Sequence, residues 1–195
     1  MGVIEDFLRD LDRLWVPQTI GKKIRLPIFG CSALLLQTSY QRLTKDSDVL
    51  ETSEHTDGIK KRLEEIAGAG SPLGQRHRLY VEIVPNGIPF LAHAADWRPL
   101  DLRLTSFDVN VLAVTDVCVS KLARFSANDT SDIDAMIRGG HMTHEDFVRR
   151  FRDAVDERST DARADGLPII VERFHTVERD MFAVGETDIT LPTWI

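Results

Sequence analysis

The fold is decided by the stretch Ile28-Phe29-Gly30-Cys31-Ser32, which is followed by Asp46-Ser47-Asp48-Val49-Leu50. The first segment predicts a strand over 23–29 that ends at a small-residue turn, with a helix over 31–40 after it. The second segment predicts a short strand over 46–50. Alternate residues of a strand share one face, so Asp46 and Asp48 are expected to direct their carboxylates to the same side.

The turn and the two aspartates have complementary chemistry. Gly30 permits a sharp turn and a close backbone approach, and the hydroxyl of Ser32 can meet a phosphate oxygen. The free N–H groups at the start of the following helix form an anion site. Two carboxylates on one strand face suit Mg²⁺, which prefers oxygen ligands and bridges to substrate phosphates. Together these features favour transfer of a nucleotide from a nucleoside triphosphate.

In this order, the two motifs resemble the signature of the polymerase-beta-like nucleotidyltransferase superfamily, and Arg42-x-Thr44 resembles its usual lead-in. The sequence departs from that pattern at Cys31, where a second glycine is commoner. The resemblance implies that Asp46 and Asp48 bind two Mg²⁺ ions, and that the turn from Gly30 through Cys31 to Ser32 binds the nucleotide.

That superfamily carries a third carboxylate on a later, neighbouring strand. Glu82 is the best placed candidate, within a strand predicted over 78–84, and Asp108 is the second, within a strand predicted over 107–114. A third carboxylate would serve as a metal ligand or as the base that accepts the proton of the attacking hydroxyl. Either residue could instead be an outward-facing acid on its strand, so the choice stays open here.

A second set of charged residues comprises Lys121, Asp129 and Asp132, on helices predicted over 116–125 and 130–137. By themselves these residues favour a structural interpretation, in which Asp129 caps its helix and Lys121 extends to solvent. However, residues 24–155 resemble the AbiEii-type nucleotidyltransferases and a related bacterial group. That resemblance implies that Lys121 binds phosphate and that Asp129 or Asp132 completes the catalytic set. It also implies a toxin–antitoxin or phage-defence context, with an RNA acceptor or a cognate antitoxin protein as partner.

The remaining patterns predict an α/β protein. Helices are expected over 3–15, ending at Pro17, and over 56–67 and 143–156; residues 68–74 are expected to be a loop and 167–174 a strand. The expected architecture is a nucleotidyltransferase-like mixed sheet flanked by helices over 1–114, with a helical part and tail over 115–195 packed against it as one unit.

The composition places limits on partners and location. The formal net charge of −7 provides no general attraction to nucleic acid. Cys31 and Cys118 are expected to be reduced thiols, and we expect a cytoplasmic protein without a membrane span. The pair His141-x-x-His144 has no third ligand nearby, which disfavours a metal site there.

We therefore expect a Mg²⁺-dependent enzyme that transfers a nucleoside monophosphate from a nucleoside triphosphate, such as ATP, to a hydroxyl acceptor. Two alternatives remain. One is a non-catalytic nucleotide-binding or interaction module of the same fold. The other is a nucleotidyltransferase that modifies a small molecule such as an antibiotic.

Overall fold

The computed structural model describes residues 2–15 and 22–194. These form two compact units. Unit 1 contains the described residues up to Ile88 together with Trp97–Leu112, and unit 2 contains Pro89–Asp96 and the described residues from Ala113 onward.

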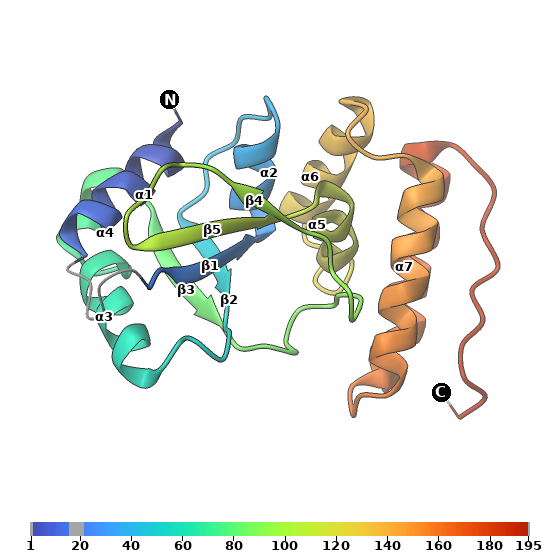
Figure 1. Cartoon of the computed structure of the whole chain (residues 1–195). Helices are drawn as coiled ribbons and strands as arrows, with labels where there is room; N and C mark the ends of the chain where they lie inside the picture. Colours follow the sequence, from blue (N-terminus) through green and yellow to red (C-terminus); the bar gives the residue numbers. More distant parts are fainter. Residues whose placement is uncertain (1, 16–21, 195) are drawn as a thin grey trace. The chain divides into compact units, whose positions relative to one another are not determined.

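The centre of unit 1 is a five-stranded sheet (Figure 1). Its strands are β1 (Ile24–Phe29), β2 (Asp46–Leu50), β3 (Tyr80–Val84), β4 (Trp97–Leu100) and β5 (Phe107–Leu112). The order across the sheet is β3-β2-β1-β5-β4. Strand β2 is parallel to β3 and antiparallel to β1, while β5 is parallel to β1 and antiparallel to β4. The sheet is therefore mixed, and β3 and β4 form its edges.

The two faces of this sheet differ sharply in chemistry. One face is apolar and buried, and its members are Leu26, Ile28, Val49, Val81, Phe107, Val109 and Val111. The opposite face carries Asp46 and Asp48 of β2 beside Tyr80 and Glu82 of β3, all at least partly exposed. The hydrophobic effect accounts for this division, since the helices of unit 1 cover the apolar face.

Four helices complete unit 1, namely α1 (Val3–Leu14), α2 (Gly30–Gln37), α3 (Asp57–Ala67) and α4 (Pro72–His77). Helix α1 buries Phe7, Leu8 and Leu11. Just after it, Trp15 packs edge-on against Phe107 of the apolar sheet face, with ring centroids 5.2 Å apart. Helix α2 begins directly where β1 ends, so its first turn lies at the same end of the sheet as Asp48, the register partner of Phe29.

Unit 2 is helical. It contains α5 (Val114–Lys121), α6 (Ala127–Arg138), α7 (His144–Ser159), the short 3₁₀ turn η1 (Ala164–Gly166), α8 (Leu167–Val177) and the π-helical turn η2 (Glu178–Phe182). Its core includes a stack of aromatic rings, in which Phe174 lies 4.1 Å from Phe151 and 5.2 Å from Phe147 between centroids. The predicted fold class, a mixed sheet with helices and a C-terminal helical part, is confirmed.

Two element predictions are wrong. Residues 68–74 are not all loop, because Ser71 caps α4 by accepting a hydrogen bond from the Gly74 N–H (2.9 Å), and Pro72 starts the helix where an N–H is not needed. Residues 167–174 are helix, not strand. Pro168 again stands in a first turn, and the buried residues of α8 recur at helical spacing: Leu167, Ile170, Phe174 and Val177.

Three further points concern the ends of elements and the membrane. Strand β4 was not expected from the sequence. Helix α1 ends at Leu14, and Pro17 lies outside the described residues. Across the described residues, no helix has both the length and the apolar character that a membrane crossing requires.

Candidate active site

Three carboxylates meet on the polar face of the sheet. Asp46, Asp48 and Glu82 each offer a carboxylate oxygen, and these oxygens all lie within 4.8 Å of one another. We call these residues the acidic triad. Asp46 and Asp48 are half-buried and Glu82 is exposed. Three like charges at this spacing repel one another, and a divalent cation relieves that repulsion while satisfying its own preference for oxygen ligands.

The backbone explains why these three side chains meet. Asp46 and Asp48 are alternate residues of β2, so they share a face. Strand β3 runs parallel to β2 with Asp48 opposite Glu82 and Asp46 opposite Tyr80. Glu82 therefore stands beside Asp48 on the same face. The other candidate, Asp108 of β5, is largely exposed and forms an ion pair with Lys23 (3.3 Å). The structure thus brings Glu82, and not Asp108, into the cluster.

The turn at Gly30 lies directly against the triad. Gly30 has φ +66°, in the left-handed region that favours glycine. A Cβ atom at this position would stand 2.3 Å from Oδ2 of Asp48, closer than a non-bonded carbon and oxygen can approach. The backbone conformation therefore favours glycine here, and a larger residue would displace the Asp48 carboxylate.

Helix α2 opens at this turn with a buried first turn that includes Cys31 and Ser32. Its N-cap residue, Phe29, provides no side-chain cap. The N-terminal end of a helix is a favourable place for an anion. The Ser32 hydroxyl donates a hydrogen bond to the backbone carbonyl of Asp46 (3.0 Å) and so ties α2 to β2. The phosphate contact expected for Ser32 and Cys31 stays a prediction.

Two residues that the sequence did not assign to the site support it. The Thr44 hydroxyl lies 2.9 Å from Oδ1 of Asp46 and donates to this carboxylate. Tyr80 stands beside Asp46 on the same face. Burial and the negative charges of Asp46, Glu82 and Asp48 raise the pKa of the Tyr80 phenol, which stays protonated. The sequence signal for Tyr80 was its position two residues before Glu82, which places both side chains on one face of the strand.

In unit 2, Lys121 is held between two carboxylates. Its Nζ lies 3.0 Å from Oδ1 of Asp129 and 2.8 Å from Oδ2 of Asp132, and both aspartates are fully buried. Arg124 also pairs with Asp129, at 2.7 Å. Burial lowers the pKa of Lys121, but the hydrogen bonds and charges of the two aspartates outweigh burial and raise it, so the ammonium stays charged.

This buried set of Lys121, Asp129 and Asp132 also has a local structural role. Ser126, not Asp129, is the N-cap of α6, and its hydroxyl accepts from the Asp129 N–H while the Asp129 side chain accepts from the Ser126 N–H. The expectation that Asp129 is the N-cap is therefore wrong by three residues. The predicted phosphate-binding role of Lys121, and the catalytic roles of Asp129 and Asp132, stay predictions.

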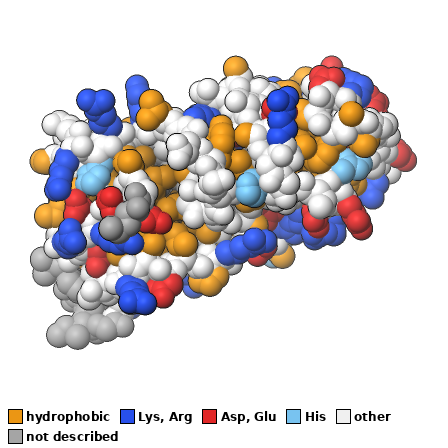
Figure 2. Space-filling model, turned by 90° about the horizontal axis from the view of Figure 1, so that it is seen from above, with side chains coloured by type: hydrophobic (Ala, Val, Ile, Leu, Met, Phe, Trp, Pro, Cys, Tyr) orange, Lys and Arg blue, Asp and Glu red, His pale blue; other side chains and the backbone are white. Residues whose placement is uncertain are grey.

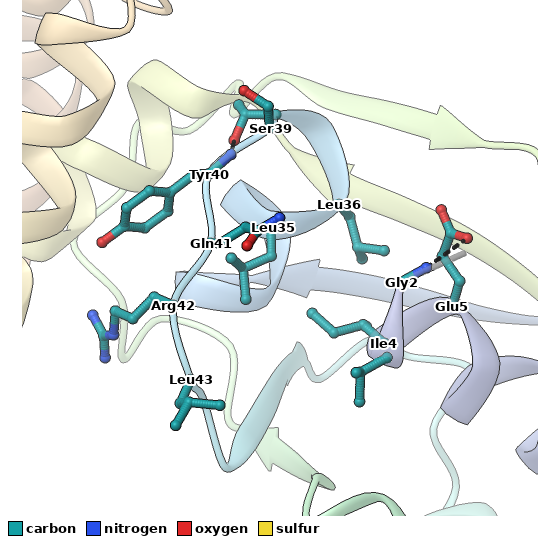
Figure 3. A pocket seen from close by; sticks show the side chains of 12 residues that line it. Gly2, Ile4, Glu5, Leu35, Leu36, Ser39, Tyr40, Gln41, Arg42 and Leu43 are labelled. Atoms are coloured by element: carbon teal, nitrogen blue, oxygen red, sulfur yellow. Dashed lines mark hydrogen bonds between the residues drawn. The ribbon is translucent and has the colours of Figure 1, made fainter.

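Two cavities in unit 1 differ in their relation to the triad. A cavity of about 670 Å³ is lined by the first turn of α1, the end of α2 and residues 38–43. Figure 3 shows Ile4, Leu35 and Leu36 lying together within it, and its described lining includes none of the triad residues. A second cavity, of about 480 Å³, includes Glu82 of the triad in its lining.

The pair His141-x-x-His144 does not form part of this site. His144 Nε2 lies 2.8 Å from Oε1 of the buried Glu178, within unit 2. Burial raises the pKa of Glu178, but hydrogen bonds from Thr187 and His144 outweigh it and lower the pKa. Glu178, the first residue of η2, is thus held to the start of α7 by His144, and Thr187 holds the segment after η2 to Glu178.

Comparison with known proteins agrees with the geometry of unit 1. No curated protein and no solved structure matches the chain. A family model described as "Nucleotidyltransferase of unknown function (DUF6036)" matches residues 8–162, which include the turn at Gly30, the acidic triad and the Lys121 cluster. The chain belongs to this family of nucleotidyltransferases.

Proposed function

We propose that the protein is a Mg²⁺-dependent nucleotidyltransferase that moves a nucleoside monophosphate from a nucleoside triphosphate to a hydroxyl acceptor. One observation carries the proposal: three carboxylates from neighbouring strands share a space of 4.8 Å, directly beside a glycine turn that opens a helix. The family match supports the same reaction class.

Each part has a distinct task in this reaction. Asp46, Asp48 and Glu82 would hold divalent cations, which neutralise the charge of the triphosphate and of the leaving pyrophosphate. The N–H groups at the start of α2 would donate hydrogen bonds to phosphate oxygens. Glu82 stands on the side of Asp48 away from the β1–α2 turn, where it can accept the proton of the incoming hydroxyl.

The residues present suit this cation on chemical grounds. All three ligands are carboxylates, the donors that Mg²⁺ selects, and the Thr44 hydroxyl orients one of them. The finer parts of the proposal rest on the sequence resemblance. They are the binding of two ions, ATP as the donor, membership of the AbiEii-type group and a toxin–antitoxin context. The phosphate-binding role of Lys121 and the catalytic roles of Asp129 and Asp132 rest on the same resemblance.

The test is to measure Mn²⁺ affinity by electron paramagnetic resonance in wild type and in Asp48→Asn. Loss of a direct ligand should exceed the 10–100-fold weakening typical of an outer-shell change, so we expect Mn²⁺ affinity to fall by more than about a hundredfold. Asp108→Asn is the matched control, because it removes a strand carboxylate outside the triad and should leave the affinity unchanged.

A companion measurement separates binding from chemistry. Wild type should bind a non-hydrolysable nucleoside triphosphate more tightly with Mg²⁺ than without it, and Asp46→Asn should remove that metal dependence. Equal, metal-independent binding by both proteins would refute the proposal and favour a non-catalytic module.

A further inference from the structure

The polar sheet face carries a hydroxyl group of the protein beside the acidic triad. Tyr80 of β3 lies opposite Asp46 in the register of the two parallel strands, and it precedes Glu82 by two residues, so it shares their face. The negative charges of Asp46, Glu82 and Asp48 all act on its phenol, which places the phenol close to the three carboxylates. The Tyr80 side chain is half-buried and lines the second cavity together with Glu82. The site therefore contains a partly exposed hydroxyl of its own.

This hydroxyl is not engaged in holding the site together. Among the residues that the structure describes, no hydrogen bond engages the Tyr80 hydroxyl. Three neighbouring hydroxyls differ from it. Ser32 donates to the Asp46 carbonyl (3.0 Å), and Thr44 donates to the Asp46 carboxylate (2.9 Å). Ser47 is fully buried on the other face of β2. Of these four hydroxyls, that of Tyr80 remains available for reaction.

The order of the strands sets Tyr80 on the side from which an acceptor attacks. In an in-line displacement, the attacking and leaving oxygens stand on opposite sides of the phosphorus. The turn at Gly30 lies against Asp48 on the β1 side, and the proposed function places the leaving phosphates there. Strand β3, which carries Tyr80, lies on the opposite side of β2 from β1. Side chains of a strand stand roughly perpendicular to the sheet, and a tyrosine is longer than an aspartate, so its hydroxyl can reach beyond the carboxylates.

The surface charge does not favour a separate polyanionic acceptor. Figure 2 shows Lys and Arg side chains interspersed with acidic and apolar ones on the visible face, and the formal net charge is −7. Such a surface gives little attraction to a phosphodiester backbone. A hydroxyl fixed on the same sheet as the triad needs no recognition surface, because its place on the framework supplies a high effective concentration.

We infer that the protein is its own acceptor, and that the site transfers a nucleoside monophosphate to the hydroxyl of Tyr80 in the same chain. This inference rests on the proposed function and names its acceptor. The adduct occupies the acceptor's place beside the triad, so each molecule is modified once. The modification therefore limits further transfer by the same molecule.

The atoms balance without a further reactant. The phenolic oxygen of Tyr80 forms a bond to the α-phosphorus of the nucleoside triphosphate, and the bond from that phosphorus to the oxygen that bridges to the β-phosphate breaks. Pyrophosphate leaves with the electron pair. The phenolic proton passes to the carboxylate of Glu82, two residues along the same strand face. The product is a phosphodiester that joins Tyr80 to the nucleoside.

The test is to incubate the full-length protein with Mg²⁺ and each of the four ribonucleoside triphosphates in turn, without any added acceptor. The mass of the intact chain is then measured, and the modified residue is located by tandem mass spectrometry. With at least one of the nucleotides, we expect the chain to gain a single nucleoside monophosphate, on Tyr80. A modified residue other than Tyr80 would overturn the inference.

Matched variants test the acceptor and the transfer within one chain. Tyr80→Phe removes the hydroxyl and keeps the aromatic ring, and should abolish the modification. Tyr40→Phe is the control and should be modified as wild type is, because Tyr40 is the other tyrosine of the chain and lines the first cavity. Asp48→Asn should stay unmodified even when it is mixed with wild type. Modification of Tyr80→Phe at the wild-type level, or of Asp48→Asn by wild type, would refute transfer to Tyr80 of the same chain.

The position of the phenol can be measured without turnover. In protein with ring-labelled tyrosine, bound Mn²⁺ should broaden the nuclear magnetic resonance signals of Tyr80 more strongly than those of Tyr40, because paramagnetic broadening falls steeply with distance. Equal broadening of the two would contradict the place of Tyr80 at the cation site. Mg²⁺-dependent nucleotide binding without modification of Tyr80 would overturn the inference alone. Absence of that nucleotide binding would refute the proposed function as well.

Discussion

The molecule contains two clusters of carboxylates that differ in burial. In unit 1, Asp46 and Asp48 are half-buried and Glu82 is exposed. In unit 2, Asp129 and Asp132 are fully buried and close on Lys121. A buried charge must be neutralised by the protein itself, whereas a solvated cluster can take a soluble cation. The first arrangement suits reversible binding, and the second suits a fixed structure.

The largest effect should come from removing the cation of the buried cluster. Lys121→Met leaves two buried carboxylates without their ammonium partner, so we expect the free energy of unfolding to fall by about 3–5 kcal/mol in urea denaturation. Lys60→Met removes a lysine that is 34% exposed and paired with two acids, and should cost no more than about 1 kcal/mol. Similar losses in the two variants would mean that Lys121 is not a structural ion.

A smaller effect should distinguish substitution of Gly30, beside the triad, from substitution of Gly140, a glycine of the same backbone conformation outside the site. Gly30→Ala and Gly140→Ala both place a side chain at positive φ (+66° and +68°), which costs about 1–2 kcal/mol in each case. Only at Gly30 does the new Cβ meet a carboxylate; at Gly140 no atom lies within 4 Å. Gly30→Ala should therefore also weaken Mn²⁺ binding, by about 10–100-fold.

Isothermal titration of Mn²⁺ into the two glycine variants checks this difference. If Gly140→Ala weakened metal binding as much as Gly30→Ala, the contact between Gly30 and Asp48 would not govern the site.

The smallest effect concerns how the stability contributed by the buried Lys121–Asp129–Asp132 cluster depends on pH. Burial raises the pKa of Asp129, but hydrogen bonds from Arg124 and Ser126 and the charge of Lys121 outweigh burial and hold it far below its ordinary 3.8. A carboxyl with a depressed folded pKa stabilises the protein above its unfolded pKa, and this contribution is lost as pH falls toward the folded pKa. The raised pKa of Lys121 acts in the opposite sense. The contribution of Lys121 to stability is therefore present below pH 10.5 and is lost at more alkaline pH.

Thermal unfolding of wild type and Asp129→Asn at pH 7 and at pH 3 measures this contribution. We expect the gap in Tm between the two proteins to narrow at pH 3. A constant gap across this range would show that the charge of Asp129 does not contribute to stability.

The sequence predicted those features of the fold that depend on local residue patterns. Alternation in Asp46-Ser47-Asp48 placed both acids on one face, and the helical period predicted α1, α3 and α7. It ranked Glu82 above Asp108 but left the choice between them open, because that choice depends on the register of β3 against β2. The burial of Lys121 was also not predictable, since a lysine on a half-apolar helix usually extends to solvent.

The elements that were missed have physical reasons of the same kind. Strand β4 contains Arg98 and Pro99 and gains its form only by pairing with β5 at the sheet edge. The Leu167–Val171 segment has a strand-like composition, but Pro168 and the spacing of its buried residues place it in a helix. In β4, tertiary pairing outweighed local preference.

The alternation of β2 limits how this gene can change in length. Ser47 and Val49 occupy the buried side of the strand, and Asp46 and Asp48 the open side. One extra residue within the strand would move every side chain on one side of the insertion to the opposite face of the sheet. An acid would then enter the apolar layer and an aliphatic side chain would become exposed. Insertions and deletions should therefore be tolerated better in residues 38–43, which have no regular structure, than within 46–50.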